Sequence, residues 1–497
     1  MLKKKITFYI RSIARYIFIL TIFQAQNISA ENRVQRTYDI AENAIYQTCF
    51  CDFCNELRTD NNVKTYRLCI KKKGKICQKI TTTNPNKRTV MIYMAADNDL
   101  RPFAARNIQQ MANIGSNHNV TIIVHLDIRI SGNKKITRRY LIEKEQVLHI
   151  DPHNPLTQQM DSGNPATLIS FCEWAIKNYP AGTYDLILWN HGTGILEPPH
   201  GKIIHPMDLF VLNPNTHLLD LDRSIGFMDA LLGQACQRGV CWDDTTGNYL
   251  SNRKLETALD TICQKYLKGK KFGIIGFDAC LMSMIEVGSF IKRYADFMVS
   301  SEEVELGMGW KYDEVLFPFS KEALSTRAFA AHIVSAYNKT YQTITNDYTL
   351  SAIELENIAL LEKNIDYIAK ILIDALSREK GGVYLAIKES KSRTTCTHFD
   401  EPTYIDLHHF YKNLYSSLLK NDSKLSQTVK KSLLAALDEG MQLIDQLVVA
   451  NTTGKNLRNA HGIAIYFPER NVHSSYKEAV FLKNNAWGNL ISRYVFG

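Results

Sequence analysis

The sequence of 497 residues lacks the features that mark fibrous, repetitive and multispan membrane proteins. It contains no long internal repeat, no sustained heptad pattern and no low-complexity tract. Beyond its N-terminal region, no segment is apolar enough to cross a bilayer. With 45% hydrophobic and 22% charged residues, the composition is that of a globular protein. The length predicts two or three structural units.

Acidic residues are outnumbered by basic ones, which gives a formal net charge of +9. The basic runs Lys3–Lys5, Lys71–Lys73 and Lys268–Lys271 have no aromatic residues interleaved with them. They therefore predict solvated surface and no nucleic-acid partner. The acidic stretches Asp220–Asp222 and Asp243-Asp244 lack the ligand spacing of an EF-hand. No metal site is expected, and a calcium site is kept as an alternative.

The first thirty residues have the order of features of a secretory signal peptide. Met1–Arg15 carries three lysines and two arginines without an acid, and Tyr16–Phe23 is apolar except for Thr21. Ile28-Ser29-Ala30 then offers a small residue for cleavage. We expect a signal peptide over 1–30 and a secreted or periplasmic protein without stable membrane insertion after cleavage. An uncleaved N-terminal anchor is the alternative.

Cysteine is concentrated near the N-terminus. Five of the 11 cysteines lie within 29 positions: Cys49, Cys51, Cys54, Cys69 and Cys77. In an oxidising compartment this spacing predicts a disulfide-linked subdomain, whereas in the cytosol it would predict zinc ligands. The signal peptide favours disulfides. Residues 31–87 are then a small cysteine-rich pro-segment or accessory subdomain. An odd total leaves at least one thiol unpaired, as a nucleophile must be.

From residue 88 onward, apolar runs alternate with helical patterns. This alternation predicts an α/β fold with a mostly parallel sheet covered on both faces. The domain should span 88–350, followed by a C-terminal α/β accessory region over 351–497 that ends with a strand at His461–Phe467. The predicted strands of the first domain are Thr89–Ala95, Asn119–Asp127, Tyr184–Trp189, Phe272–Phe277 and Phe297–Ser300, with a hairpin over Tyr140–His149. The predicted helices are Ala104–Met111 (capped by Asp97-Asn98-Asp99), Pro165–Lys177, Asn252–Leu267 and Leu281–Lys292.

Two reactive side chains follow two of these strands. His191 comes after Tyr184–Trp189, and Cys280 comes after Phe272–Phe277. If the strands are neighbours, their carboxyl ends bring the two residues together. A cysteine attacks as its thiolate, and an imidazole can take the thiol proton and later give it to the leaving amine.

The surrounding residues fit the same chemistry. The main-chain N–H groups of Gly192 and Cys280 are candidates for an oxyanion hole, and the helix predicted after Cys280 would favour the thiolate at its N-terminus. Each residue also has a purely structural interpretation. His191 can be a hydrogen-bonded structural histidine, Cys280 a core residue, and Asp278 a helix cap.

Four motifs, in this order along the chain, resemble those of the clostripain family of cysteine peptidases, which belongs to the caspase-like clan. They are TVMIYMAADNDL (Thr89–Leu100), LILWNHGTG (Leu186–Gly194), FDACLMSMIEV (Phe277–Val287) and SSEEVELGMGWKYDEVL (Ser300–Leu316). The likeness extends from about Arg88 to the C-terminus. It implies a caspase-like α/β/α sandwich in which Cys280 is the nucleophile and His191 the base, with no cofactor required for the chemistry.

The resemblance also implies a substrate preference. The family generally cleaves after arginine or lysine, so Asp278 is the expected floor of the pocket for the substrate cation. Some relatives carry a second acid near the Gly-x-Gly-Trp turn, which in this chain is Gly307-Met308-Gly309-Trp310, with Met308 in the middle. The candidates that would supply the acid instead are Glu302, Glu303 and Glu305.

Many members of the family are zymogens that are cut in the loop after the catalytic histidine. The corresponding loop, 195–244, predicts self-cleavage after Lys202, Arg223 or Arg238. A disulfide between Cys236 and Cys241 would keep the pieces joined. Protein or peptide substrates with a basic P1 residue and a monomeric enzyme are expected. The rival interpretation is a catalytically silent relative that acts as an envelope or extracellular binding module.

Overall fold

The computed structural model describes residues 87–131, 134–150, 160–197, 209–223, 239–378, 380–420 and 426–497, which all lie in one compact unit, Lys75–Gly497. The predicted signal peptide and the five clustered cysteines lie outside the described residues, as do Lys202, Cys236 and Arg238. The boundaries predicted at 30 and 87 therefore stay predictions, as does the division near 350.

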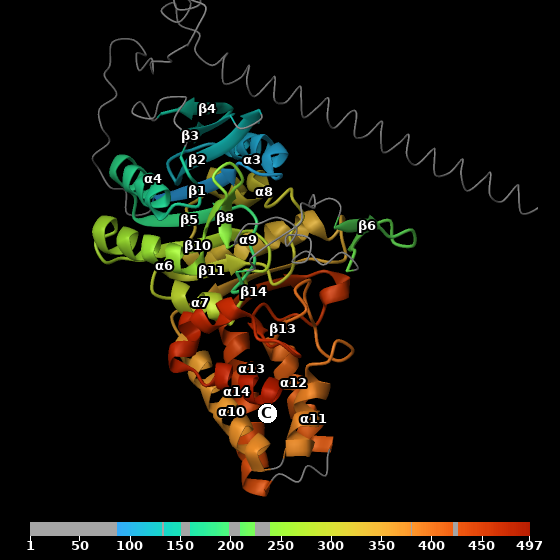
Figure 1. Ribbon diagram of the computed structural model, residues 1–497. Helices are drawn as coiled ribbons and strands as arrows, with labels where there is room; N and C mark the ends of the chain where they lie inside the picture. Colours follow the sequence, from blue (N-terminus) through green and yellow to red (C-terminus); the bar gives the residue numbers. More distant parts are fainter. Residues whose placement is uncertain are drawn as a thin grey trace, which may run out of the picture. The chain divides into compact units, whose positions relative to one another are not determined.

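A nine-stranded mixed sheet forms the centre of this unit, in the order β14-β12-β11-β10-β5-β1-β2-β3-β4 (Figure 1). Its middle is parallel and consists of β2 (Val120–Ser131), β1 (Arg88–Ala96), β5 (Thr183–Trp189), β10 (Phe272–Asp278) and β11 (Ala295–Ser300). The strands on both edges are antiparallel: β3 (Lys134–Glu143) and β4 (Gln146–His149) on one, β12 (Thr349–Glu354) and β14 (Val448–Thr453) on the other. The continuous apolar runs of β1 and β10 are buried on both faces, as a central parallel strand requires.

Helices cover both faces of the sheet, which confirms the α/β sandwich expected from the sequence. The helices α3 (Arg101–Ile114), α8 (Tyr312–Leu316) and α9 (Thr326–Tyr341) pack on one another over one face. On the other face lie α4 (Pro165–Asn178), α6 (Asn252–Thr261) and α7 (Ile285–Ile291). Short hairpins β6 (Phe210–Leu212)–β7 (Leu219–Leu221) and β8 (Val240–Asp243)–β9 (Asn248–Leu250) belong to the long loop after β5.

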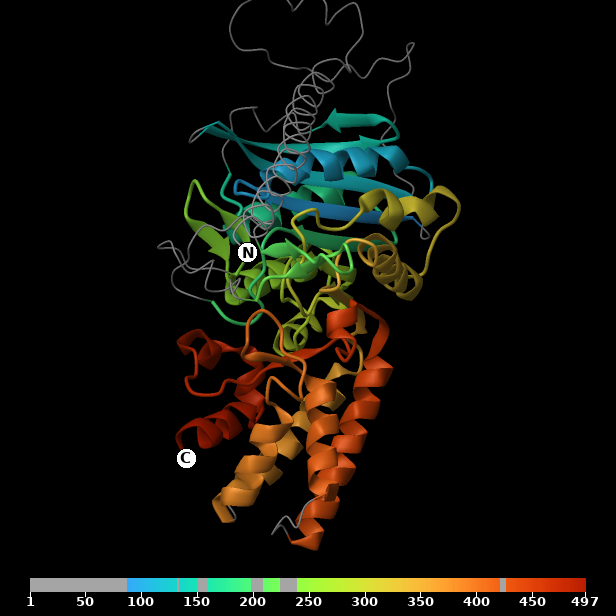
Figure 2. The ribbon, with the colours of Figure 1, turned by 90° about the vertical axis from the view of Figure 1, so that its right-hand side faces the viewer.

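The C-terminal region is mainly helical and lies beside the β14 edge of the sheet (Figures 1 and 2). It contains α10 (Ile358–Arg378), α11 (Lys380–Ser390), α12 (Leu407–Lys420), α13 (Gln427–Leu447) and α14 (Trp487–Phe496). The predicted strand at His461–Phe467 is shorter, β15 (Ala464–Tyr466), and pairs with β13 (Tyr404–Asp406) in a separate two-stranded sheet. The remaining short helices are η1 (Ile262–Tyr266), η2 (Phe317–Ser320), η3 (Lys455–Leu457), η4 (Ser474–Glu478) and η5 (Val480–Asn484).

Two predicted helices differ from the structure. The helix expected from Leu281 begins only at Ile285, because Leu281 adopts a left-handed φ of 61°. The main-chain N–H groups of Leu281 and Ser283 donate to the carbonyls of Glu303 and Ser301 instead of starting a helical turn. The helix from Asn252 continues beyond Thr261 as the π-turn η1. The predicted cap of α3 is also wrong, since its N-cap position is Leu100 and no side chain caps it.

The described cysteines are Cys172, Cys241, Cys263, Cys280 and Cys396, and all are buried free thiols. Cys241 is thus a free thiol, while Cys236, with which a disulfide was considered, lies outside the described residues. Among the residues that the structure describes, no helix has both the length and the apolar character needed to cross a membrane.

Candidate active site

Three neighbouring strands end at the same edge of the sheet and carry the candidate residues. The register aligns Met94 of β1 with Trp189 of β5, and Trp189 with Asp278 of β10. The predicted neighbourhood of β5 and β10 is thus confirmed. His191 and Cys280 each follow their aligned residue by two positions, so both lie just beyond the carboxyl ends of adjacent strands.

Two glycines allow the turns after β5 and β10 to touch. A Cβ atom on Gly192 would overlap the carbonyl oxygen of Cys280. One on Gly194, whose φ is 65°, would lie 2.7 Å from the carbonyl oxygen of Leu281. The absence of side chains at these two positions lets the histidine turn pack backbone to backbone against the cysteine turn.

Cys280 lies on a sharp turn and is almost fully enclosed. Its residue exposure is 6%, and Leu281 holds the left-handed conformation immediately after it. The main-chain N–H of Glu305 donates to Sγ at 3.3 Å, and the thiol faces the Glu305 carbonyl at 3.8 Å. Burial raises the pKa of the Cys280 thiol well above its usual range, and the Glu305 N–H offsets this only in part. Since α7 begins at Ile285, no helix N-terminus directly follows the thiol to favour the thiolate.

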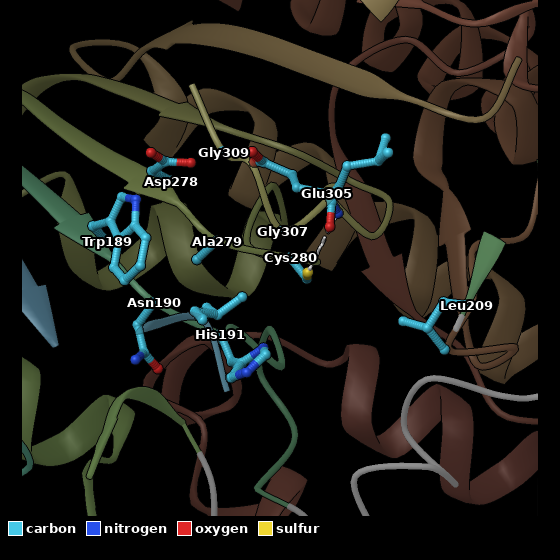
Figure 3. A pocket seen from close by; sticks show the side chains of 12 residues that line it. Trp189, Asn190, His191, Leu209, Asp278, Ala279, Cys280, Glu305, Gly307 and Gly309 are labelled. Atoms are coloured by element: carbon cyan, nitrogen blue, oxygen red, sulfur yellow. Dashed lines mark hydrogen bonds between the residues drawn. The ribbon is translucent and has the colours of Figure 1, made fainter. Parts of the chain in front are cut away.

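His191 is also buried, and its ring has an acidic partner. Its Nε2 atom lies 2.6 Å from Oδ1 of Asp99, a residue that follows β1. Figure 3 shows His191 and Cys280 at the wall of one pocket. The sequence position of Asp99 predicts a helix cap and does not indicate this contact. The feature of the sequence that could have predicted the contact is the position of Asp99 just after β1, because β1 pairs with β5.

The pocket that contains both residues is nearly filled. It holds about 20 Å³ of free space, which is room for about one water molecule. Asp278 and Glu305 lie at one side of it (Figure 3), and Leu209 lines it from the loop after β5. Leu209 is 1% exposed, and its carbonyl accepts the Asp222 N–H at 2.7 Å. The loop predicted to be cleaved therefore contributes a wall of the pocket in the intact chain.

Asp278 does not cap a helix; its side chain lies against the Gly307–Trp310 turn. Its carboxylate accepts the Trp310 N–H at 3.0 Å and the Tyr312 hydroxyl at 2.8 Å. A Cβ atom on Gly309 would lie 2.6 Å from the Asp278 Oδ1, so only glycine fits there. Burial raises the pKa of Asp278 to about 7, and the two hydrogen bonds partly oppose this shift.

Of the three other acids predicted as candidates, only Glu305 lines this pocket. Neither of its carboxylate oxygens has a hydrogen bond of normal geometry. Burial, followed by the charge of Asp278, raises the pKa of Glu305 well above its usual range. Glu302 instead accepts the Gly462 N–H at 2.9 Å, and Glu303 accepts the Arg223 guanidinium at 2.8 Å.

Met308, in the Gly307–Trp310 turn, is not among the residues that line the pocket. Its sulfur lies 3.4 Å from Nη1 of Arg106, at the surface. Asn107 of α3 donates to the Met308 carbonyl at 3.2 Å and accepts the Trp189 indole N–H at 2.9 Å. These bonds fix the Gly307–Trp310 turn to the end of β5, whereas the Met308 side chain lies at the surface beside Arg106.

The described residues contain no group of three or more histidine, cysteine and acidic side chains that could hold a metal ion. Asp243, from one of the predicted acidic stretches, bonds to the ammonium of Lys135, and Asp244 pairs with Arg129 at 3.3 Å. Calcium dependence therefore stays an open prediction.

Comparison with known proteins identifies the family. The model of the clostripain family matches residues 92–202 and 229–493. Clostripain of Hathewaya histolytica is 26% identical over 283 residues, which are 52% of this chain and 45% of clostripain. The match thus spans less than half the length of that relative.

Two solved structures show the same fold. An inactive zymogen C11 protease from Parabacteroides distasonis has a TM-score of 0.52 and 18% identity, with 83% of this chain and 99% of that chain covered. A secreted C11 cysteine protease from Bacteroides thetaiotaomicron, in complex with an irreversible peptide inhibitor, has a TM-score of 0.50 and 18% identity, with 82% and 99% covered. Since the family model matches well over half of the residues of this chain, the chain belongs to the clostripain family.

Proposed function

We propose that this protein is an exported endopeptidase that hydrolyses peptide bonds after basic residues, with Cys280 as nucleophile and His191 as general base. The observation that carries the proposal is the placement of both side chains on one pocket, at the ends of adjacent strands. Export rests on the predicted signal peptide, and it agrees with the secreted relative from Bacteroides thetaiotaomicron.

The chemistry follows from these two groups. The imidazole takes the proton from Sγ, and the thiolate attacks the carbonyl carbon of the scissile bond to form an S–C bond. The π electrons of the carbonyl bond move to its oxygen, which becomes an oxyanion. In the described part of the chain, neither the Gly192 nor the Cys280 N–H donates a hydrogen bond to a main-chain carbonyl. Both are thus candidates to bind the oxyanion. The C–N bond then breaks as the imidazolium protonates the amine, and water hydrolyses the thioester.

The preference for a basic residue rests on the carboxyl groups of Asp278 and Glu305. Both are buried, and neither pairs with a lysine or arginine among the described residues. An arginine or lysine at P1 would supply the missing cation and form charge-assisted bonds. An uncharged P1 side chain would leave the two carboxyl groups without a cation, which disfavours it.

Activation by self-cleavage is supported by the small volume of the pocket. The free space in the pocket is only about 20 Å³, and the wall at Leu209 belongs to the predicted cleavage loop. Arg223 forms ion pairs with Glu303 at 2.8 Å and Asp347 at 3.2 Å. We therefore favour Lys202 or Arg238 over Arg223 as the cleaved residue. N-terminal sequencing of the active enzyme would decide this, and full activity in an uncut chain would refute activation by cleavage.

The direct test is hydrolysis of fluorogenic peptides that differ only in P1, with Arg, Lys, Gln, Leu or Asp. Wild type and Cys280→Ala are compared in reducing buffer, with and without calcium. Cleavage of the Arg and Lys peptides by the wild type alone supports the proposal. Cleavage after another residue keeps the nucleophile but rejects the acidic pocket. No cleavage, even after limited trypsin treatment, would favour the catalytically silent binding module.

A further inference from the structure

We propose that Asp99 is a positioning residue that orients the His191 imidazole, so that the peptidase uses a Cys280–His191–Asp99 triad. This inference rests on the proposed peptidase function. The sequence alone indicated only a dyad.

The sheet order places the three residues as a triad requires. The strands run β10-β5-β1, so β5, which leads to His191, lies between the strand that leads to Cys280 and the strand that leads to Asp99. All three strands are parallel, so their carboxyl ends meet at one edge. The histidine therefore has the cysteine on one side and the aspartate on the other.

The contact itself is short and largely shielded from water. His191 Nε2 and Asp99 Oδ1 are 2.6 Å apart, and their side chains are 9% and 18% exposed. An exposed ion pair between flexible side chains is worth little, but these two side chains are largely buried, and His191 lines the pocket. The pair can thus hold the ring in one orientation.

The turn that carries Asp99 is fixed on both sides of it. Before Asp99, the Asn98 side-chain amide donates to the carbonyls of Ala95 and Trp242 at 2.9 and 3.0 Å. After it, the Leu100 N–H donates to the Asn98 side-chain oxygen at 3.0 Å, and Leu100 itself lines the pocket. Asp99 is therefore presented to the histidine by an ordered turn.

The contact assigns different roles to the two ring nitrogens. With Nε2 on the carboxylate, the neutral imidazole carries its proton on Nε2, and Nδ1 is the nitrogen that accepts the Sγ proton. During acylation the S–C bond forms and the C–N bond breaks, while the same proton passes from Nδ1 to the departing amine. Asp99 stays ionised throughout and stabilises the imidazolium between the two transfers.

The test compares two substrates with the same acyl part, a P1 residue that the wild type accepts, and either an amide or an ester leaving group. An amine must be protonated to leave, whereas an alkoxide leaves with less help. In activated, full-length protein, we expect Asp99→Ala to lower kcat for the amide about 100-fold and for the ester less than about 10-fold. Asp99→Asn keeps an oxygen acceptor, so it should retain more amide activity than Asp99→Ala.

The matched control is Asp244→Asn, which removes a nearby carboxylate whose bonds go to Arg129 and the Trp242 indole. It should leave the amide-to-ester ratio unchanged. Equal losses on both substrates in folded Asp99→Ala, or no loss on either, would overturn the triad but not the peptidase function. If the wild type hydrolyses neither substrate, the peptidase function fails and the triad fails with it.

Discussion

Two groups of buried carboxyl side chains lie near the carboxyl edge of the central sheet, and they differ in how their charge is balanced. In the first, Lys135 of β3 bonds to Asp127 at 2.9 Å and to Asp243, while Arg129 bonds to Asp97 at 2.6 Å. In the second, Asp278 and Glu305 share the pocket without a lysine or arginine partner among the described residues. In the first group, the charges of the acids are balanced by a lysine and an arginine of the chain, whereas the second group has no such cation among the described residues.

The difference separates a structural site from a site for substrate. A buried carboxylate without a partner costs stability, so a fold keeps it only where the fold has another use for it. The Lys135 ammonium is 1% exposed and in contact with its acids, which leaves no room for a ligand. Asp278 and Glu305 instead line the pocket that contains Cys280, the proposed nucleophile. The comparison thus favours the second group as the site for a substrate cation.

The largest effect on stability is expected from Lys135→Met. It leaves Asp127 and Asp243 buried without their cation, and breaking such a buried pair costs about 3–5 kcal/mol. Chemical denaturation measures the loss. The control Lys177→Met removes a lysine that is 63% exposed and paired with Glu173, so it should change stability by less than about 1 kcal/mol. Similar stabilities of the two variants would contradict the structural role of Lys135.

Asp278→Asn should affect catalysis more than folding. We expect kcat/KM for an Arg peptide to fall about 100-fold, because the substrate cation loses a charged partner. The Asn oxygen can still accept the Trp310 N–H, so the fold should be kept. A peptide with Leu at P1 serves as the control substrate. An equal loss on both peptides would show that Asp278 supports the turn and does not select the substrate.

The same substitution tests the pKa shift. Because the pKa of Asp278 is raised to about 7 in the folded state, the folded chain holds a proton that the unfolded chain releases above about pH 4. Stability from this group therefore falls as the pH rises from about 4 to 7. Above pH 7, Asp278→Asn should unfold at the same or a higher denaturant concentration than the wild type. A clear loss of stability at pH 8 would contradict the burial of an unpaired charge.

Glu305→Gln should have the smallest effect. The main-chain groups of Glu305 that contact Sγ remain, so only the second carboxyl group is lost. We expect kcat/KM for the Arg peptide to fall about 10-fold, since the interaction is with one of two acids. The control Glu303→Gln alters an acid that is bonded to Arg223. A larger fall in Arg selectivity from Glu303→Gln would show that the wrong acid was assigned to the pocket.

The strands and the reactive pair could be read from the sequence, because buried parallel strands are continuous apolar runs. Thr89–Ala95 and Phe272–Phe277 became β1 and β10 within one or two residues. The placement of His191 and Cys280 followed from the rule that parallel strands end at one edge.

The side-chain partners could not be read in this way, because they depend on how distant turns meet. Asp99 has the sequence position of a helix cap, yet its carboxylate reaches the histidine after β5. Glu302, Glu303 and Glu305 are almost consecutive, and their side chains have three different surroundings. The helix after Cys280 starts late because contacts with Ser301 and Glu303 hold the intervening turn.

The most direct test of the account is irreversible labelling of Cys280. A thiol-reactive peptide with Arg at P1 is incubated with the activated protein, and the modified residue is mapped by mass spectrometry; the matched probe carries Gln. We predict one adduct, on Cys280, formed much faster with the Arg probe than with the Gln probe and absent in His191→Ala on the same timescale. Labelling of another cysteine, or equal rates for the two probes, would contradict the assignment of the nucleophile or of the acidic pocket, respectively.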